Sequence, residues 1–161
     1  MSGLPFSNRR SERQSDGATA KPQARPRLVI ADDDIIIQTL LSASLERDFE
    51  IVGVVGDSEE AIALVAEQLP DVALVDVEMP GGGGPHAVRG IVEVAPQVAI
   101  VVFSGDESDA VVRELIQAGA VAFCRKGMDP QELTDLLIES IAVRANELAR
   151  AGAPISPAAA A

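Results

Sequence analysis

The stretch LVIADDDIII, residues 28–37, places three aspartates in a row directly after a short apolar run. Valine and isoleucine in such a run are typical of a strand that is buried on both faces. Neighbouring carboxylates repel one another, and each loses hydration when it is drawn toward a protein core. The stretch therefore predicts a buried strand that ends in an acidic group, whose charge some other group must offset.

Apolar runs of the same kind recur along the chain, and each is followed by a segment with helical periodicity. The runs are RLVIA (27–31), FEIVGVV (49–55), VALVD (72–76), VAIVVF (98–103) and VAFC (121–124). The expected helices cover 35–47, 58–69, 85–95, 109–119 and 130–151. Alternating strands and helices predict a parallel sheet with helices on both faces. We expect a doubly wound, flavodoxin-like α/β fold with five strands in the order 2-1-3-4-5.

Capping residues and glycines mark several boundaries of these expected helices. The expected first residues or caps of the last four helices are Ser58, Pro85, Ser108 and Asp129. The run GGGG (81–84) lacks the Lys-Ser/Thr of a phosphate-binding loop, so we interpret it as a flexible loop before the third helix. We expect His86 on the surface and Cys124 inside the last strand.

Composition narrows the functional classes. The net charge of −12 and the 2% aromatic content argue against a generic nucleic-acid binder. One cysteine allows no internal disulfide, and no apolar run reaches the length of a membrane span. We expect a cytoplasmic protein with a disordered basic leader (1–26), one domain (27–150) and a flexible tail (151–161). Contact of the basic leader with an acidic partner is an alternative, but disorder is the simpler interpretation.

Polar side chains follow four of the expected strands, at the point where each strand ends. Asp32 and Asp33 follow the first strand, Asp76 ends the third, and Ser104 and Lys126 follow the fourth and fifth. In the expected order these four strands are neighbours, so the side chains converge on one edge of the sheet. Clustered carboxylates suit Mg²⁺, and a cation, an ammonium and a hydroxyl around one aspartate suit phosphoryl transfer to it.

This ordered set resembles the receiver domain of bacterial two-component response regulators, over roughly Arg27 to Arg150. The resemblance implies that Asp76, in the motif DVEMP, is the phosphoacceptor. It implies Mg²⁺ as cofactor, with Asp33 as direct ligand and Asp32 acting through water. Asp76 and the backbone carbonyl of Glu78 would complete the protein ligands.

The resemblance also implies a switch and its partners. Ser104 would move to the phosphoryl group beside Lys126, and Phe123 would turn inward behind it. The surface that changes would be the fourth helix, fifth strand and fifth helix, roughly 107–149. The expected phosphodonor is a sensor histidine kinase or a phosphotransfer protein, and the module could also take part in a phosphorelay. Glu78 and Asp106 would flank the water that removes the phosphoryl group and so set its lifetime.

Two residues depart from the family pattern. Many receivers carry Lys-Pro after the fifth strand, with a cis peptide bond that fixes the next loop, whereas this chain has Lys126-Gly127. We therefore expect a freer loop here. The residue three positions before the lysine is often tyrosine or phenylalanine. Phe123 could make the same inward movement, but it has no hydroxyl that could form a hydrogen bond.

Several alternatives stay open at this point. Only eleven residues follow Arg150, too few for a helix-turn-helix, so we expect output through protein contacts and not through direct DNA binding. The pair Asp76 and Glu78 weakly imitates a haloacid-dehalogenase-type phosphatase, but that family usually carries its nucleophile on the first strand. A degenerate receiver that only docks is a further alternative, and so is a constitutive homodimer through the exposed face of 130–151. We expect no turnover of an external substrate, and therefore no enzyme in the ordinary sense.

Overall fold

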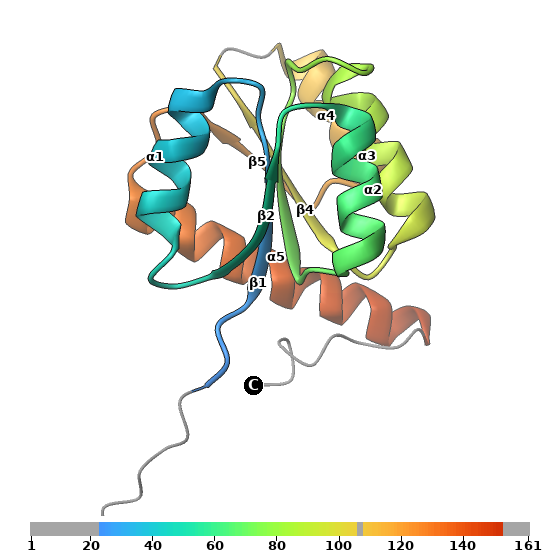
Figure 1. Cartoon of the computed structure of the whole chain (residues 1–161). Coiled ribbons are helices and arrows are strands. Elements are labelled where there is room, and N and C mark those ends of the chain that lie inside the picture. The colour runs from blue at the N-terminus through green and yellow to red at the C-terminus, as the bar shows by residue number, and fades with distance from the viewer. Residues whose placement is uncertain (1–22, 106–107, 153–161) are drawn as a thin grey trace, which may run out of the picture.

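The computed structural model describes residues 23–105 and 108–152, and within them a single parallel sheet lies between two layers of helices (Figure 1). The five strands of these residues lie in the order β2-β1-β3-β4-β5, which confirms the predicted fold. They are β1 (Arg27–Ala31), β2 (Glu50–Val55), β3 (Val72–Asp76), β4 (Ala99–Ser104) and β5 (Ala122–Arg125). The helices are α1 (Ile35–Leu45), α2 (Ser58–Gln68), α3 (Gly83–Val94), α4 (Asp109–Ala118) and α5 (Pro130–Ala151).

Alternate residues of each central strand enter two separate hydrophobic clusters, one on each face of the sheet. In β1, Val29 belongs to a cluster that includes residues of α2, α3 and α4, whereas Leu28 and Ile30 belong to a cluster that includes residues of α1 and α5. The three central strands are buried on both faces, as the unbroken Val and Ile runs predict. Figure 1 shows α1 and α5 on one side of the sheet and the other three helices on the opposite side.

Several helix boundaries differ from the sequence-based expectation. Helix α2 is capped by Asp57, whose side chain accepts the amides of Glu59 and Glu60, and not by Ser58. Helix α3 begins at Gly83, two residues before Pro85, so the last two glycines of the run lie inside the helix and not in a loop before it. Helix α1 ends at Leu45, two residues earlier than expected.

Other caps agree with the sequence. Ser108 caps α4 and Asp129 caps α5, as expected, each by accepting a backbone amide in the first turn. Asp34 caps α1 in the same way. Gly119 is the C-cap of α4, and its carbonyl oxygen accepts a hydrogen bond from the Arg144 guanidinium of α5. This bond ties the end of α4 to the middle of α5.

The predicted leader up to residue 22 and the tail from residue 153 lie outside the described residues. Within residues 23–105 and 108–152, no helix combines the length and the apolar sequence that a membrane span requires.

Candidate functional site

Three carboxylates meet at the carboxyl end of the sheet. Asp32 follows β1 and Asp76 ends β3, two neighbouring strands, and both side chains are buried, with exposures of 0% and 2%. Asp33 is exposed beside them, and one carboxylate oxygen of each of the three lies within 4.8 Å of the others. All three donors are oxygens, the ligand type that a hard cation such as Mg²⁺ prefers. The residues present therefore fit a divalent cation.

The third aspartate of the run has a different role. The Asp34 side chain accepts the amide of Ile36 at 2.8 Å and so caps α1. Its own amide donates to Oδ1 of Asp32, also at 2.8 Å. Asp34 therefore holds the helix start and orients Asp32, and it does not belong to the carboxylate cluster.

Lys126 supplies the positive charge of the site. Its Nζ lies 2.9 Å from Oδ2 of Asp32 and 3.2 Å from Oδ2 of Asp76. Partial burial lowers the pKa of Lys126, but the bonds and charges of Asp32 and Asp76 outweigh this effect and leave the pKa above its ordinary value. The lysine is therefore charged at neutral pH and bridges the two buried carboxylates.

The backbone around Lys126 fixes its position. The amide of Lys126 donates to the carbonyl oxygen of Ser104 at 2.7 Å, which continues the pairing of β4 and β5. A turn follows, in which the amide of Met128 donates to the carbonyl oxygen of Arg125. Gly127 has φ +94°, a conformation that favours glycine in a turn of this kind.

Negative charge exceeds positive charge at the site. Burial raises the pKa of Asp76 from its ordinary value of 3.8 to about 6, and the Asp32 charge adds to the rise, although Lys126 acts against it. Two buried carboxylates and an exposed third share one ammonium, so added positive charge is favourable here. A bound divalent cation would provide it.

Ser104 and Phe123 lie on the neighbouring strands β4 and β5. Ser104 is buried at the end of β4, two residues beyond Val102 and thus on the same face of the sheet. Phe123 pairs with Val102 and is partly buried against the cluster that contains it. The two side chains that the resemblance assigns to the switch therefore face the same side of the sheet.

The two residues assigned to phosphoryl lifetime have different outcomes. The Glu78 side chain is exposed, and its backbone amide donates to Oδ1 of Asp76 at 3.3 Å. Asp106 lies outside the described residues.

One contact of the site has no signal in the sequence. The ring of Phe103 lies under Lys126, with its centroid 5.3 Å from Nζ, which is within the range of a cation–π interaction. Phe103 belongs to an apolar strand, where a core side chain is the simplest expectation, so its position under the lysine could not be read from the pattern.

Cys124 and His86 take no part in the site. Cys124 is buried in β5, as expected, and burial raises the pKa of its thiol to about 12, so it is not a thiolate at neutral pH. His86 is half-exposed on α3 and pairs with Glu59 of α2.

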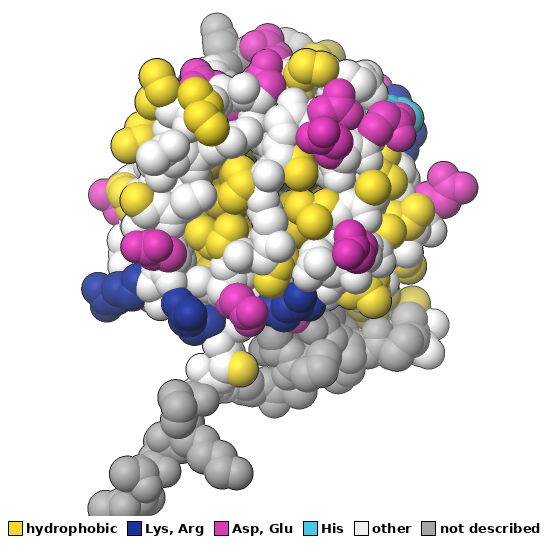
Figure 2. Space-filling model, in the orientation of Figure 1, with side chains coloured by type: hydrophobic (Ala, Val, Ile, Leu, Met, Phe, Trp, Pro, Cys, Tyr) yellow, Lys and Arg dark blue, Asp and Glu magenta, His cyan; other side chains and the backbone are white. Residues whose placement is uncertain are grey.

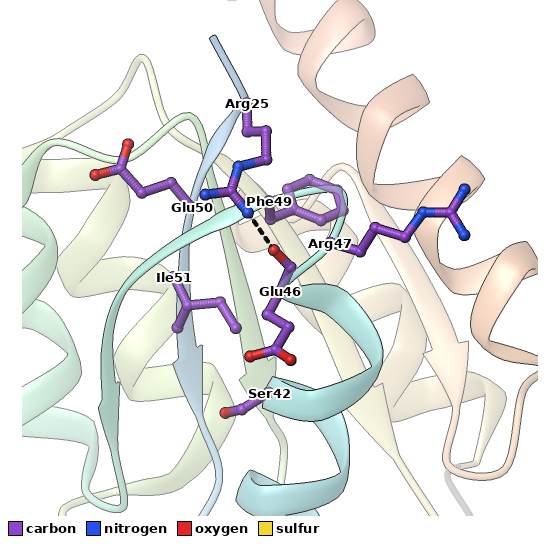
Figure 3. Close-up of a pocket in the computed structure, with 7 residues that line it drawn as sticks. All are labelled: Arg25, Ser42, Glu46, Arg47, Phe49, Glu50 and Ile51. Atoms are coloured by element: carbon purple, nitrogen blue, oxygen red, sulfur yellow. Dashed lines mark hydrogen bonds between the residues drawn. The ribbon is translucent and has the colours of Figure 1, made fainter.

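A hollow lies at the opposite end of the strands from the carboxylate cluster, between the end of α1 and the start of β2 (Figure 3). Its lining residues are Arg25, Ser42, Glu46, Arg47, Phe49, Glu50 and Ile51. The Arg25 guanidinium reaches across it to the carbonyl oxygen of Glu46. The hollow is separate from the carboxylate cluster and shares no residue with it.

Comparison with known proteins gives a consistent result. The family model described as the response regulator receiver domain matches residues 28–138. The chain is 33% identical over 114 residues to the response regulator GacA of Pseudomonas aeruginosa, covering 69% of this chain and 53% of that protein. It is 33% identical over 132 residues to the transcriptional regulatory protein DegU of Brevibacillus brevis, covering 81% and 52%. The chain thus spans about half the length of these curated relatives.

Solved structures show the same fold. The response regulator domain of CheB from Thermotoga maritima superposes with a TM-score of 0.65 at 27% identity, covering 76% of this chain and 97% of that one. The receiver domain of a sensor histidine kinase from Pseudomonas aeruginosa superposes with a TM-score of 0.66 at 24% identity, covering 73% and 98%. The second of these structures has a magnesium ion coordinated in its active-site cleft.

Proposed function

This chain belongs to the response regulator receiver domain family of two-component systems, and we propose that it accepts a phosphoryl group on Asp76 in a Mg²⁺-dependent reaction. One observation carries the proposal: the Asp76 carboxylate is buried between Asp32, Asp33 and Lys126, with carboxylate oxygens within 4.8 Å and the lysine at 3.2 Å. Three carboxylates around one lysine leave negative charge that a bound cation would offset.

The chemistry assigns a role to each side chain. A carboxylate oxygen of Asp76 attacks the phosphorus of the donor, an acyl phosphate forms, and the P–N or P–O bond to the donor breaks. The donor is a phosphohistidine of a sensor kinase or phosphotransfer protein, or a small molecule such as acetyl phosphate. Lys126 pairs with the phosphoryl oxygens, and Ser104 donates its hydroxyl to one of them.

A divalent cation, when bound, supplies positive charge to the transferring phosphoryl group. Asp33 and Asp76 would hold it directly with the backbone carbonyl of Glu78, and Asp32 would act through a water. The exposure of Asp33 supports a direct role, because Asp33 reaches solvent while Asp32 is buried and paired with Lys126. Glu78 and Asp106 would flank the water that later hydrolyses the acyl phosphate.

The output of the module is a protein contact. Phosphorylation would draw Ser104 toward Asp76 and allow Phe123 to turn inward, which changes the surface of α4, β5 and α5. A downstream protein or a second copy of the chain would bind that surface. The proposal includes no turnover of an external substrate.

Intact-mass measurement tests the proposal. With Mg²⁺ and acetyl phosphate, we expect the wild-type mass to rise by one phosphoryl group, and the Asp76→Asn variant to remain unlabelled. Asp135→Asn, which changes an exposed aspartate of α5, is the matched control and should label like wild type. Labelling of Asp76→Asn at the wild-type rate would contradict the assignment.

The same samples test the phosphatase alternative. A haloacid-dehalogenase-type enzyme would release phosphate from a generic phosphomonoester over many turnovers. A receiver should show no such turnover beyond the buffer blank.

A further inference from the structure

The loop between β3 and α3 is bonded at two points by one residue from outside it. Ser58, the first residue of α2, is fully buried. Its backbone amide donates to the carbonyl oxygen of Pro80 at 3.0 Å, and its hydroxyl donates to the carbonyl oxygen of Gly83 at 2.9 Å. Ser58 therefore spans the turn from Pro80 to Gly83.

The turn has few restraints of its own. Gly81, Gly82 and Gly83 have φ values of +83°, +109° and +72°, and glycine loses more conformational freedom on folding than any other residue. Gly82 is the N-cap of α3 and makes no side-chain cap bond. The turn thus depends on neighbouring elements for its order.

The start of α2 occupies the space that a side chain at Gly81 would need. A Cβ on Gly81 would lie 2.8 Å from the carboxylate oxygens of Asp57, the residue that caps α2. Asp57, the cap of α2, and Ser58, its first residue, thus both contact the glycine turn. The close approach explains why glycine is needed at this position.

The turn is connected to the candidate site by short bonds. The amide of Gly84 donates to the carbonyl oxygen of Val77 at 2.8 Å, and a Cβ on Gly84 would lie 2.8 Å from the Val77 Cα. Val77 lies between Asp76 and Glu78, whose amide donates to Asp76. A displacement of the glycine turn would therefore move the backbone that carries Glu78.

From these contacts we propose that Ser58 is a positioning residue, whose hydroxyl holds the glycine turn so that the Glu78 carbonyl faces the cation. The inference rests on the proposed function, because it concerns the backbone ligand of the same site. It adds the first residue of α2, a helix that contributes no ligand and no nucleophile to the site.

A pair of serine variants tests this role. Ser58→Ala removes the hydroxyl bond to Gly83 and keeps the amide bond to Pro80. The matched control is Ser140→Ala, because Ser140 is also buried and donates its hydroxyl to a backbone carbonyl oxygen, that of Leu136 in α5. Both variants lose one buried hydrogen bond of the same kind, but only one of them faces the turn.

The first measurement is Mg²⁺ affinity, well below the unfolding temperature. We expect Ser58→Ala to bind Mg²⁺ about 3- to 10-fold more weakly than wild type, and Ser140→Ala to stay within about twofold. The second measurement is hydrogen exchange without metal, in which Ser58→Ala should speed exchange at residues 77–84 and Ser140→Ala should not. Ser58→Cys leaves no cavity, because its thiol is slightly larger than the hydroxyl and is a weaker donor, so it should follow Ser58→Ala even if that variant folds poorly.

Equal Mg²⁺ affinity and equal exchange at 77–84 in Ser58→Ala and Ser140→Ala would overturn the inference. Wild-type labelling at Asp76 would then leave the proposed function intact. If wild type itself neither bound Mg²⁺ nor labelled, the proposed function would fail. The exchange measurement in the absence of metal would still decide whether Ser58 holds the turn.

Discussion

At the scale of single residues, the three neighbouring aspartates divide their work. Asp34 caps α1, Asp32 is buried against Lys126, and Asp33 remains exposed at the rim. The neighbouring amides and the lysine make the run tolerable, while burial and the Asp32 charge raise the pKa of Asp76. Two predictions follow from this division, one on pH and one on the cation.

Replacing Asp76 should stabilise the metal-free protein at neutral pH. The pKa of Asp76 is raised in the folded state, so protonation of Asp76 favours folding. This contribution to the free energy of unfolding is lost as pH rises through about 6. In EDTA at pH 7.5, we expect the free energy of unfolding of Asp76→Asn, measured with urea, to exceed that of wild type by roughly 1–3 kcal/mol. The difference should shrink toward zero near pH 4. An equal difference at both pH values would contradict this cause.

Asp33 and Asp34 offer a matched test of the cation site. Asp33→Asn should lower Mg²⁺ affinity by about tenfold or more, because it removes the one exposed carboxylate of the cluster. Asp34→Asn removes a neighbouring charge but keeps an N-cap residue, so its affinity should change by less than about threefold. A titration of both variants checks this, and equal losses would show that only the net charge matters.

At the scale of elements, α1 presents an apolar face beside the site. Ile35, Ile36 and Leu40 are 69%, 65% and 59% exposed, and Figure 2 shows hydrophobic side chains gathered over α1 at the upper left. Helix α1 begins directly after the aspartates that form the rim. If Asp76 accepts a phosphoryl group from a protein, we expect that protein to cover this end of the helix.

Polar substitution on α1 should therefore slow phosphotransfer from a protein donor. With a soluble histidine kinase core that labels wild type, we expect Leu40→Ser to reduce the rate about fivefold or more. Labelling by acetyl phosphate, which needs no docking surface, should not change. The control is Val94→Ser, which alters an exposed apolar residue at the end of α3. Equal slowing with both donors would place the defect in the site and not in docking.

Much of this element level could be predicted from sequence, and the failures have a common cause. Valine-rich runs and strand-end polar residues were enough for the sheet order and for the convergence of Asp32, Asp76 and Lys126. The predicted cap of α2 was wrong because Asp57 and Ser58 have similar capping preferences. The Ser58 hydroxyl instead bonds Gly83, 25 residues away, which no local pattern reveals. Phe103 under Lys126 was missed because a buried apolar residue gives no functional signal.

At the scale of the whole molecule, hydrogen bonds connect the site to one side of the fold. Ser104 and Lys126 are joined through their backbones across β4 and β5, and Arg144 of α5 bonds the end of α4 at Gly119. The three elements α4, β5 and α5 are thus linked to one another and to the site. A change at Ser104 is expected to reach all three.

Hydrogen exchange with and without acetyl phosphate tests this coupling. We expect phosphorylation to alter exchange within residues 104–126 and along α5, with α2 largely unaffected. A change confined to residues far from 104–126 would contradict the switch.

Sedimentation of the same samples tests the alternative, a dimer through the exposed face of α5, where Ile138 and Val143 are 47% and 38% exposed. A dimer that depends on the switch should appear only in the sample phosphorylated with acetyl phosphate. A dimer of equal strength in both states would favour the constitutive interface.

The candidate site is assembled from the ends of strands that lie far apart in the sequence, so it exists only when the sheet is complete. An unfolded chain offers no such cluster, and a cation bound there is bound by the folded state alone. Each tenfold rise of free Mg²⁺ above its dissociation constant then adds about 1.4 kcal/mol to the free energy of unfolding. The ionic composition of the surroundings would therefore govern how long the chain survives proteolysis, before any signal reaches it.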